Sequence, residues 1–132
     1  MNNMSNVKII IADDNKTLAE LLKTYIEKNS NYKVLGVATS SKQQIELTNG
    51  LDPDVIITDI ERKDEEISGL DFILDSENKN RKEKYIIVTA SAKEEVLMKN
   101  NFEMPSNVLE YIRKPFDFEK ILTILNNIDL IN

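Results

Sequence analysis

The sequence predicts an α/β domain in which five parallel strands form one sheet covered by helices on both faces. Short apolar runs rich in β-branched residues alternate with segments of helical periodicity along the whole chain, as repeated strand–helix units do. Within each run the apolar residues are nearly continuous, which is typical of strands buried on both faces. The length of 132 residues is that of one domain.

Each strand is predicted from one apolar run. The strands are expected at 7–12, 33–38, 54–59, 84–90 and 108–114. The intervening helices are expected from about Leu18 to Ile26, over 42–49, from Gly69 to about Ser76, from 92 to about 100, and from Asp117 to about Ile128. The polar stretch 76–84 is expected to be a loop.

The helices are predicted from apolar spacing and from capping residues. Ser41 is expected to cap the second helix and Asn49-Gly50 to end it, with Ile45 and Leu47 as its modest apolar content. Asp117 is expected to cap the last helix. The inward residues of the first helix are Leu18, Leu21, Leu22, Tyr25 and Ile26, and those of the last are Phe118, Ile121, Leu122, Leu125 and Ile128.

Composition and charge exclude several classes of protein. The net charge of −6 argues against direct binding of nucleic acid by this domain. The chain has no Cys and no His, so disulfides, thiolate or imidazole metal sites and His-dependent catalysis are unavailable. No apolar run is long enough to cross a membrane, and no signal peptide opens the chain. A cytoplasmic location without membrane contact is therefore expected.

Polar side chains gather where the predicted strands end. Asp13 and Asp14 follow the first strand, Asp59 ends the third, Thr89 closes the fourth, and Lys114 ends the fifth. In open α/β sheets, ligands bind beyond the carboxyl ends of the strands. Three neighbouring carboxylates need a cation, and Mg²⁺ suits oxygen ligands best. A nucleophilic carboxylate, a metal, a hydroxyl and an ammonium group together suit phosphoryl transfer.

Taken singly, each of these residues has a plainer interpretation. Asp13 and Asp14 could cap the first helix, and Asp59 could be a turn residue. Thr89 could be an ordinary strand-end hydroxyl, and Lys114 a solvated charge. Their occurrence together at the right strand ends favours a functional site.

Four stretches also carry a resemblance to a known family. They are IIIADDN at 9–15, VIITDI at 55–60, IIVTA at 86–90 and YIRKPF at 111–116. In order and spacing they resemble a response-regulator receiver domain of two-component signalling, and the ADDN opening is similar to that of sporulation-type regulators. The resemblance implies a flavodoxin-like (βα)5 fold with strand order 2-1-3-4-5. It also implies one receiver domain over 1–132, with any effector domain absent from this chain.

The resemblance implies a phosphoacceptor and a metal site. Asp59 would accept a phosphoryl group from a sensor histidine kinase or a phosphotransfer protein. Asp13, Asp14 and Asp59 would hold Mg²⁺ together with the backbone carbonyl of Glu61. The Glu61 side chain is expected near the phosphoryl group, where it would influence hydrolysis.

The resemblance also implies a switch. Thr89 would be the switch hydroxyl, and Lys114 would contact the phosphoryl group and precede a cis bond to Pro115. Tyr111 would be the switch aromatic, turning inward on activation. The changed surface, from the fourth helix to the last, would control an effector domain or a downstream protein, and two copies could pair on activation.

Two departures from the family pattern leave alternatives open. Residues 61–68 lack the usual Met-Pro pair and are strongly acidic, and 103–107 replace a Gly-Ala pair. The alternative function is a degenerate receiver, a protein-interaction module that works without phosphorylation. A haloacid-dehalogenase-type phosphatase would want Asp where Glu61 stands. No enzyme is therefore expected beyond the domain's own phosphorylation and dephosphorylation.

Overall fold

One parallel sheet organises the structure. The computed structural model describes residues 7–61, 69–98, 100–101 and 103–128. Its strands are β1 (Lys8–Ala12), β2 (Lys33–Ala38), β3 (Val55–Thr58), β4 (Lys84–Thr89) and β5 (Val108–Arg113). Neighbouring strands pair in parallel in the order β2-β1-β3-β4-β5. The predicted doubly wound sheet and its strand order are thus confirmed.

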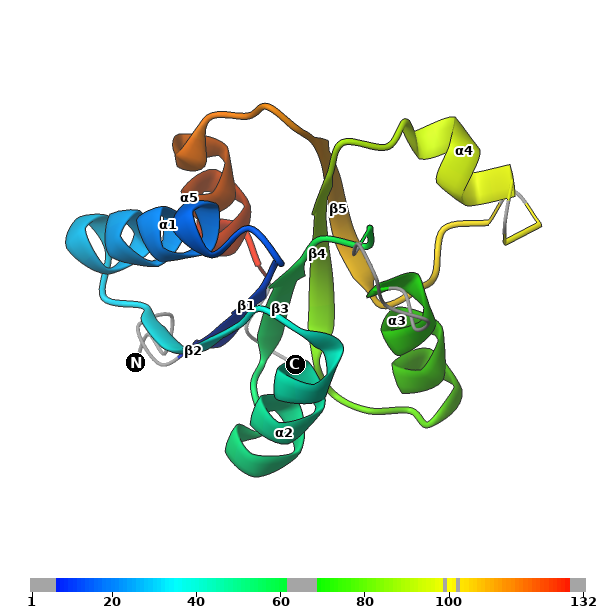
Figure 1. Cartoon of the computed structure of the whole chain (residues 1–132), viewed down its shortest axis with the longest axis horizontal. Helices are drawn as coiled ribbons and strands as arrows, with labels where there is room; N and C mark the ends of the chain where they lie inside the picture. Colours follow the sequence, from blue (N-terminus) through cyan, green and yellow to red (C-terminus); the bar gives the residue numbers. More distant parts are fainter. Residues whose placement is uncertain (1–6, 62–68, 99, 102, 129–132) are drawn as a thin grey trace.

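Helices cover both faces of this sheet. They are α1 (Lys16–Asn29), α2 (Ser41–Leu51), α3 (Gly69–Asn78), α4 (Lys93–Met98) and α5 (Phe118–Asn126). Figure 1 shows α1 and α5 together on one side of the sheet, with α3 and α4 on the other. One buried apolar cluster lies under α1 and α5, and a second lies under α2, α3 and α4.

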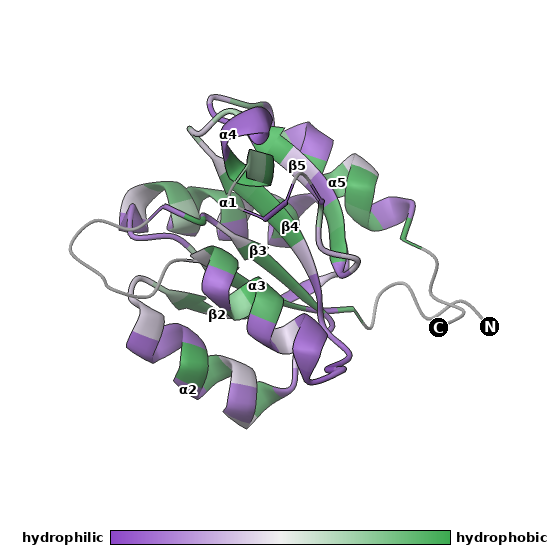
Figure 2. Cartoon of the chain, turned by 90° about the vertical axis from the view of Figure 1, so that its right-hand side faces the viewer, coloured by the Kyte–Doolittle hydropathy of each residue, from purple (hydrophilic) through white to green (hydrophobic). Residues whose placement is uncertain are grey.

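The strands supply both clusters because successive side chains of a strand point to opposite faces. In β1, Ile9 and Ile11 join the cluster under α1 and α5, whereas Ile10 and Ala12 join the other. Figure 2 shows the central strands as predominantly apolar ribbons between more polar helices. Burial on both faces explains why the predicted strands read as continuous apolar runs.

The N-terminus of α1 is capped by Asn15. Its side-chain oxygen accepts a hydrogen bond from the Leu18 N–H at 3.0 Å. Asn15, rather than Asp13 or Asp14, is therefore the capping residue of this helix. The predicted inward position of Leu21 is wrong, because this side chain is 55% exposed. The residues of α1 that are buried are Ala19, Leu22 and Ile26.

The predicted boundaries of α2 are wrong at both ends. Ser40, not Ser41, is the N-cap, and its hydroxyl accepts a hydrogen bond from the Gln43 N–H at 3.2 Å. The helix continues through Asn49-Gly50, so this pair does not end it. It stops at Asp52, which adopts the left-handed conformation with φ 52°, a common way to close the last helical turn.

The inward face of α2 is partly polar. Leu47 packs against the core, whereas Ile45 is 42% exposed. Gln44 and Thr48 are buried instead, at 1% and 9% exposure. These two residues are one turn apart and share a helix face, so a polar stripe of α2 turns inward.

The third helix and the segment after it depart from the prediction as well. α3 extends to Asn78 rather than to Ser76. In the predicted loop, Glu83 is 1% exposed. Its carboxylate accepts hydrogen bonds from the Ser76 hydroxyl at 2.8 Å and from the Arg81 Nε at 2.9 Å. These partners stabilise a charge that burial alone would destabilise.

The remaining predicted elements have small differences. Asp117 is the N-cap of α5, although its side chain makes no capping hydrogen bond. α4 is described over Lys93–Met98, and the predicted continuation to about 100 includes residue 99, outside the described part. Most of the predicted acidic loop, 62–68, also lies outside it. No described helix combines the length and apolar character needed to span a bilayer.

Candidate functional site

The carboxyl ends of four strands bring the predicted site residues to one edge of the sheet. Backbone hydrogen bonds continue the ladder just past the strand ends. The Asp13 N–H donates to the last carbonyl of β2 at 2.9 Å, and the Asp59 N–H donates to the last carbonyl of β1 at 2.9 Å. The Lys114 N–H donates to the Thr89 carbonyl at 2.7 Å. The backbone at Asp13, Asp59 and Lys114 is therefore fixed by a hydrogen bond to the neighbouring strand.

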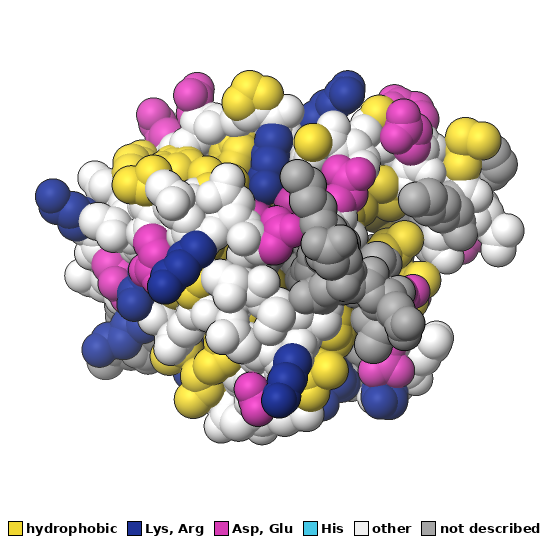
Figure 3. Space-filling model, viewed as in Figure 1, with side chains coloured by type: hydrophobic (Ala, Val, Ile, Leu, Met, Phe, Trp, Pro, Cys, Tyr) yellow, Lys and Arg dark blue, Asp and Glu magenta, His cyan; other side chains and the backbone are white. Residues whose placement is uncertain are grey.

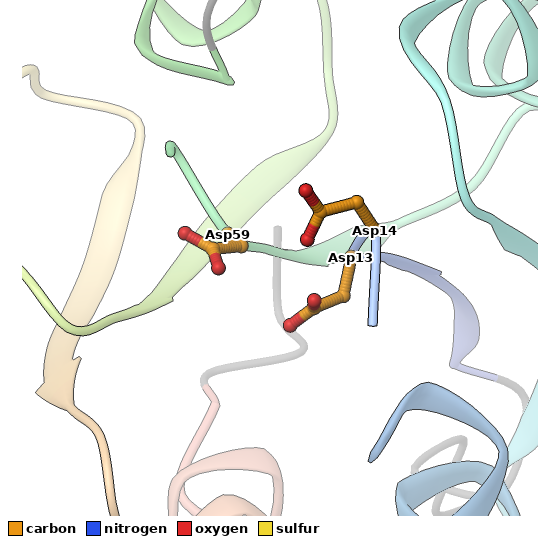
Figure 4. A group of neighbouring side chains, drawn as sticks. All are labelled: Asp13, Asp14 and Asp59. Carbon is orange, nitrogen blue, oxygen red and sulfur yellow. The ribbon is translucent and has the colours of Figure 1, made fainter. Parts of the chain in front are cut away.

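Three carboxylates form a compact acidic cluster. Asp13, Asp14 and Asp59 each place one oxygen within 4.8 Å of the others. Figure 4 shows the three side chains grouped just beyond β1 and β3. Asp13 and Asp59 are 6% and 7% exposed, and Asp14 is exposed. Crowded carboxylates repel one another unless a cation lies among them, and hard oxygen ligands at this spacing fit Mg²⁺.

Lys114 joins two of these carboxylates. Its Nζ lies 2.8 Å from Asp13 Oδ2 and 2.9 Å from Asp59 Oδ2. Burial disfavours the charged ammonium, but the two hydrogen bonds and the two negative charges outweigh it and raise the pKa of Lys114 above its ordinary value. The bond from Lys114 to Pro115 is cis, as the resemblance implied.

The second oxygen of each aspartate binds a backbone N–H. Asp13 Oδ1 accepts from the Asn15 N–H at 2.8 Å, and Asp59 Oδ1 accepts from the Glu61 N–H at 2.8 Å. Each carboxylate is thus held by a backbone donor on one oxygen and by Lys114 on the other. Such bonds fix the direction of the carboxylate oxygens.

The Thr89 hydroxyl is held by Glu61. Thr89 is fully buried, and its Oγ1 donates to Glu61 Oε1 at 3.2 Å. The same Glu61 binds Asp59 through its backbone N–H. Glu61 therefore links Asp59, the candidate phosphoacceptor that follows β3, to the hydroxyl of Thr89 at the end of β4.

Tyr111 contacts the loop that follows Thr89. The Tyr111 hydroxyl donates to the Ser91 carbonyl at 2.6 Å, and Arg113 Nε donates to the Ala90 carbonyl at 3.2 Å. Burial, and then the negative charge of Glu61, raise the pKa of Tyr111 to about 12. Two side chains of β5 thus hold the β4–α4 loop in its present position.

Comparison with known proteins assigns this arrangement to a family. The family description "Response regulator receiver domain" matches residues 9–126. The chain belongs to this family. The predicted family is therefore confirmed, and the fold neighbours agree with it.

The curated relatives of this receiver domain are regulators. It is 35% identical over 100 residues to the transcriptional regulatory protein YdfI of Bacillus subtilis, covering 74% of this chain and 44% of that protein. It is 26% identical over 121 residues to the chemotaxis protein CheY of Thermotoga maritima, covering 92% of this chain and 96% of that protein. The chain spans about half the length of three of the curated regulators that it matches.

Solved structures resemble the receiver over almost its whole length. A LuxR-family DNA-binding response regulator from Staphylococcus aureus has a TM-score of 0.78 at 23% identity, covering 91% of this chain and 96% of that chain. The receiver domain of the Francisella response regulator 1452 has a TM-score of 0.73 at 26% identity, covering 92% and 94%. The likeness to sporulation-type receivers stays a prediction.

The sequence predicted which residues meet at the site, but three of their hydrogen bonds could not be predicted from it. The structure joins Asp13, Asp14, Asp59 and Lys114, as strand order predicts. The hydrogen bond from Thr89 to Glu61 was not anticipated, and neither were the bonds that Tyr111 and Arg113 make to the β4–α4 loop. They join residues at least 20 positions apart, so no local sequence pattern could indicate them.

Proposed function

We propose that this receiver is a phosphorylation switch in which Asp59 accepts a phosphoryl group from a sensor histidine kinase or a phosphotransfer protein. The observation that carries the proposal is the position of the Asp59 carboxylate. It lies with two other carboxylates inside 4.8 Å, 2.9 Å from the Lys114 ammonium, at the end of a buried strand. A nucleophile needs this kind of fixed position and charge environment.

The acidic cluster would hold the metal that such a reaction uses. Asp13, Asp14 and Asp59 would supply carboxylate oxygens to Mg²⁺, and the backbone carbonyl of Glu61 would supply a further ligand. The spacing of the three carboxylates supports this assignment. When bound, Mg²⁺ would neutralise the charge that develops on the transferred phosphoryl oxygens.

The transfer itself would be an in-line displacement at phosphorus. An Asp59 carboxylate oxygen would form the new bond to phosphorus while the phosphorus–nitrogen bond of the donor phosphohistidine breaks. The electron pair of that bond would leave with the imidazole nitrogen. Lys114, which faces Asp59 Oδ2, would then stabilise a phosphoryl oxygen.

Phosphorylation would act on the surface through Thr89 and Tyr111. The new group adds about −1.5 to −2 charges and three strong acceptors. Thr89 would exchange its bond to Glu61 for one to a phosphoryl oxygen, and Tyr111 would turn inward as the β4–α4 loop moves. A shift from mostly inactive to mostly active requires about 5.5 kcal/mol of preference for the active arrangement.

The output is expected at the surface formed by α4, β5 and α5. This surface would control an effector domain or a downstream protein, and two copies could pair through it. Such partners agree with the regulator relatives, of whose length this chain covers 44 to 50%. This role would place the protein in the cytoplasm.

Nucleic acid is not proposed as a ligand of this domain. The basic side chains on the face in Figure 3 are scattered, and the net charge of the chain is −6, whereas phosphate binding needs a basic face.

Intact-mass spectrometry after incubation with acetyl phosphate and Mg²⁺ tests the proposal. Wild-type protein should gain the mass of one phosphoryl group only when Mg²⁺ is present, and Asp59→Asn should gain none. Circular dichroism of both proteins controls for folding. A folded wild-type protein that gains no mass would contradict the proposal and favour a receiver that works as an interaction module without phosphorylation.

A further inference from the structure

A second polar site lies between α2 and α3, near the amino ends of the strands, whereas Asp59 lies beyond their carboxyl ends. A cleft of about 530 Å³ is lined by α2 between Gln44 and Asn49, by α3, by the segment between α3 and β4, and by Tyr85 near the start of β4. Asp59 follows the carboxyl end of β3, whereas Tyr85 stands at the amino end of the neighbouring parallel strand. The cleft is therefore separate from the acidic cluster.

The polar atoms of this cleft are short of hydrogen-bond partners. Among the described residues, four buried side-chain atoms have no partner, and three of them belong to residues that line this cleft. They are both amide atoms of Gln44 and the hydroxyl oxygen of Thr48. Gln44 is 1% exposed. An unsatisfied buried polar group is destabilising, so these atoms favour a partner that the described residues do not supply.

Apolar groups flank the unpartnered atoms. Ile45 is 42% exposed beside Gln44 and lines the same cleft. Phe72 lines it from α3 and is half-buried. A few directed polar groups between apolar walls, in a volume of several hundred Å³, are typical of small-molecule sites.

The basic side chains of the cleft do not favour an anionic ligand. Lys79 lies 3.1 Å from Asp75, and Arg81 lies 2.9 Å from Glu83. Each basic side chain that lines the described cleft is thus already paired with a carboxylate. A phosphate would have to break one of these pairs, whereas a neutral molecule would leave both intact.

We propose that this cleft binds a neutral planar molecule with an amide-type edge, of the class of a nucleobase or nucleoside. The Gln44 amide offers one donor and one acceptor side by side, which matches such an edge. The Thr48 hydroxyl, one turn further along α2, would contact the same molecule. The amide atoms of Gln44 and the hydroxyl of Thr48 are buried at the α2 side of the cleft, so the proposed binding requires these side chains to turn toward the cleft.

Chemical-shift mapping with free bases and nucleosides tests this proposal. ¹⁵N-labelled full chain is titrated with adenine, uracil, adenosine and uridine at millimolar concentration. At least one probe should shift the amide signals of α2, α3 and Tyr85, with saturation, and should raise Tm. Gln44→Met keeps the shape but removes the donor and the acceptor, so it should weaken binding about tenfold or more.

Two matched variants make the result specific. Gln43→Met makes the same change at an exposed neighbour outside the cleft and should bind like the wild type. Asp59→Asn should also bind like the wild type, because the cleft is independent of phosphorylation. The proposal is overturned if no probe shifts these signals, or if Gln44→Met binds as tightly as the wild type. In that case ordered water alone satisfies Gln44 and Thr48.

Discussion

At the scale of single residues, Glu61 is the side chain whose effect on the switch is clearest. Its Oε1 accepts the hydrogen bond of the buried Thr89 hydroxyl at 3.2 Å, the same hydroxyl that the proposed switch requires. In the proposed switch, a phosphoryl group on Asp59 would compete with Glu61 for this donor. Glu61 would therefore favour the arrangement without phosphate.

Replacing Glu61 should lengthen the life of the aspartyl phosphate. Glu61→Ala frees the Thr89 hydroxyl, and one such bond contributes about 0.5–1.5 kcal/mol. The phosphorylated state should therefore persist about two- to tenfold longer, measured as loss of the added mass after the phosphodonor is removed. Glu61→Gln keeps an acceptor without the charge and separates the two contributions. An unchanged lifetime in Glu61→Ala would refute the role given to this side chain.

Tyr111 should make the stability of the domain depend on alkaline pH. Its pKa is raised to about 12 in the folded chain, against about 10 when unfolded. The folded state keeps the Tyr111 proton up to a higher pH than the unfolded state does. The resulting contribution of Tyr111 to the free energy of unfolding is therefore complete below about pH 10 and is lost as the pH rises through about 12.

Urea unfolding at several alkaline pH values checks this expectation. The difference in stability between wild type and Tyr111→Phe should shrink as the pH rises through that range. Comparing the two proteins cancels the ionisation of other tyrosines, which include the buried Tyr85 with its raised pKa. A difference that stays constant over the whole range would show that Tyr111 ionises normally.

At the scale of elements, the start of α3 is constrained by its approach to β3. A Cβ added to Gly69 would lie 2.5 Å from the Asp59 carbonyl oxygen and 2.6 Å from the Ile60 Cα. The Gly69 N–H also donates to the Ile60 carbonyl at 3.1 Å. Glycine is thus required here for close packing, and the position of Asp59 depends on it.

Gly69→Ala should lower the free energy of unfolding by about 1–3 kcal/mol, because backbone atoms cannot yield as a side chain does. Gly50→Ala is the matched control. Gly50 lies inside α2 with nothing within 4 Å of the added Cβ, so alanine should stabilise the chain by about 0.5–1 kcal/mol. Urea unfolding measures both changes. Equal effects of the two substitutions would contradict the close approach at Gly69.

At the scale of the whole molecule, the sheet and the edge that carries the site could be predicted because the signals are local. Continuous apolar runs marked the strands, and the strand ends carried Asp13, Asp59 and Lys114 together. The inward face of α2 could not be predicted, since the helix buries Gln44 and exposes Ile45. Amphipathic periodicity predicts that the apolar residues of a helix face inward, and tertiary packing overrides that pattern in α2.

Binding of Mg²⁺ to the acidic cluster should raise the thermal stability of the whole domain. The cluster of Asp13, Asp14 and Asp59 exists only in the folded chain, because Asp59 lies far in sequence from the adjacent Asp13 and Asp14. A cation that binds it stabilises the fold by about 2.7 kcal/mol when its free concentration is 100 times Kd. For a domain of this size, Tm should rise by roughly 10 °C.

Thermal unfolding with and without Mg²⁺ measures this effect, with NaCl at equal ionic strength as the control for screening. The net charge of −6 means that any salt relieves some repulsion. Only specific binding raises Tm more with Mg²⁺ than with NaCl, and Asp13→Asn should remove most of that excess. An equal rise in both salts would mean that Lys114 alone neutralises the cluster, and the assignment of the metal site would fail.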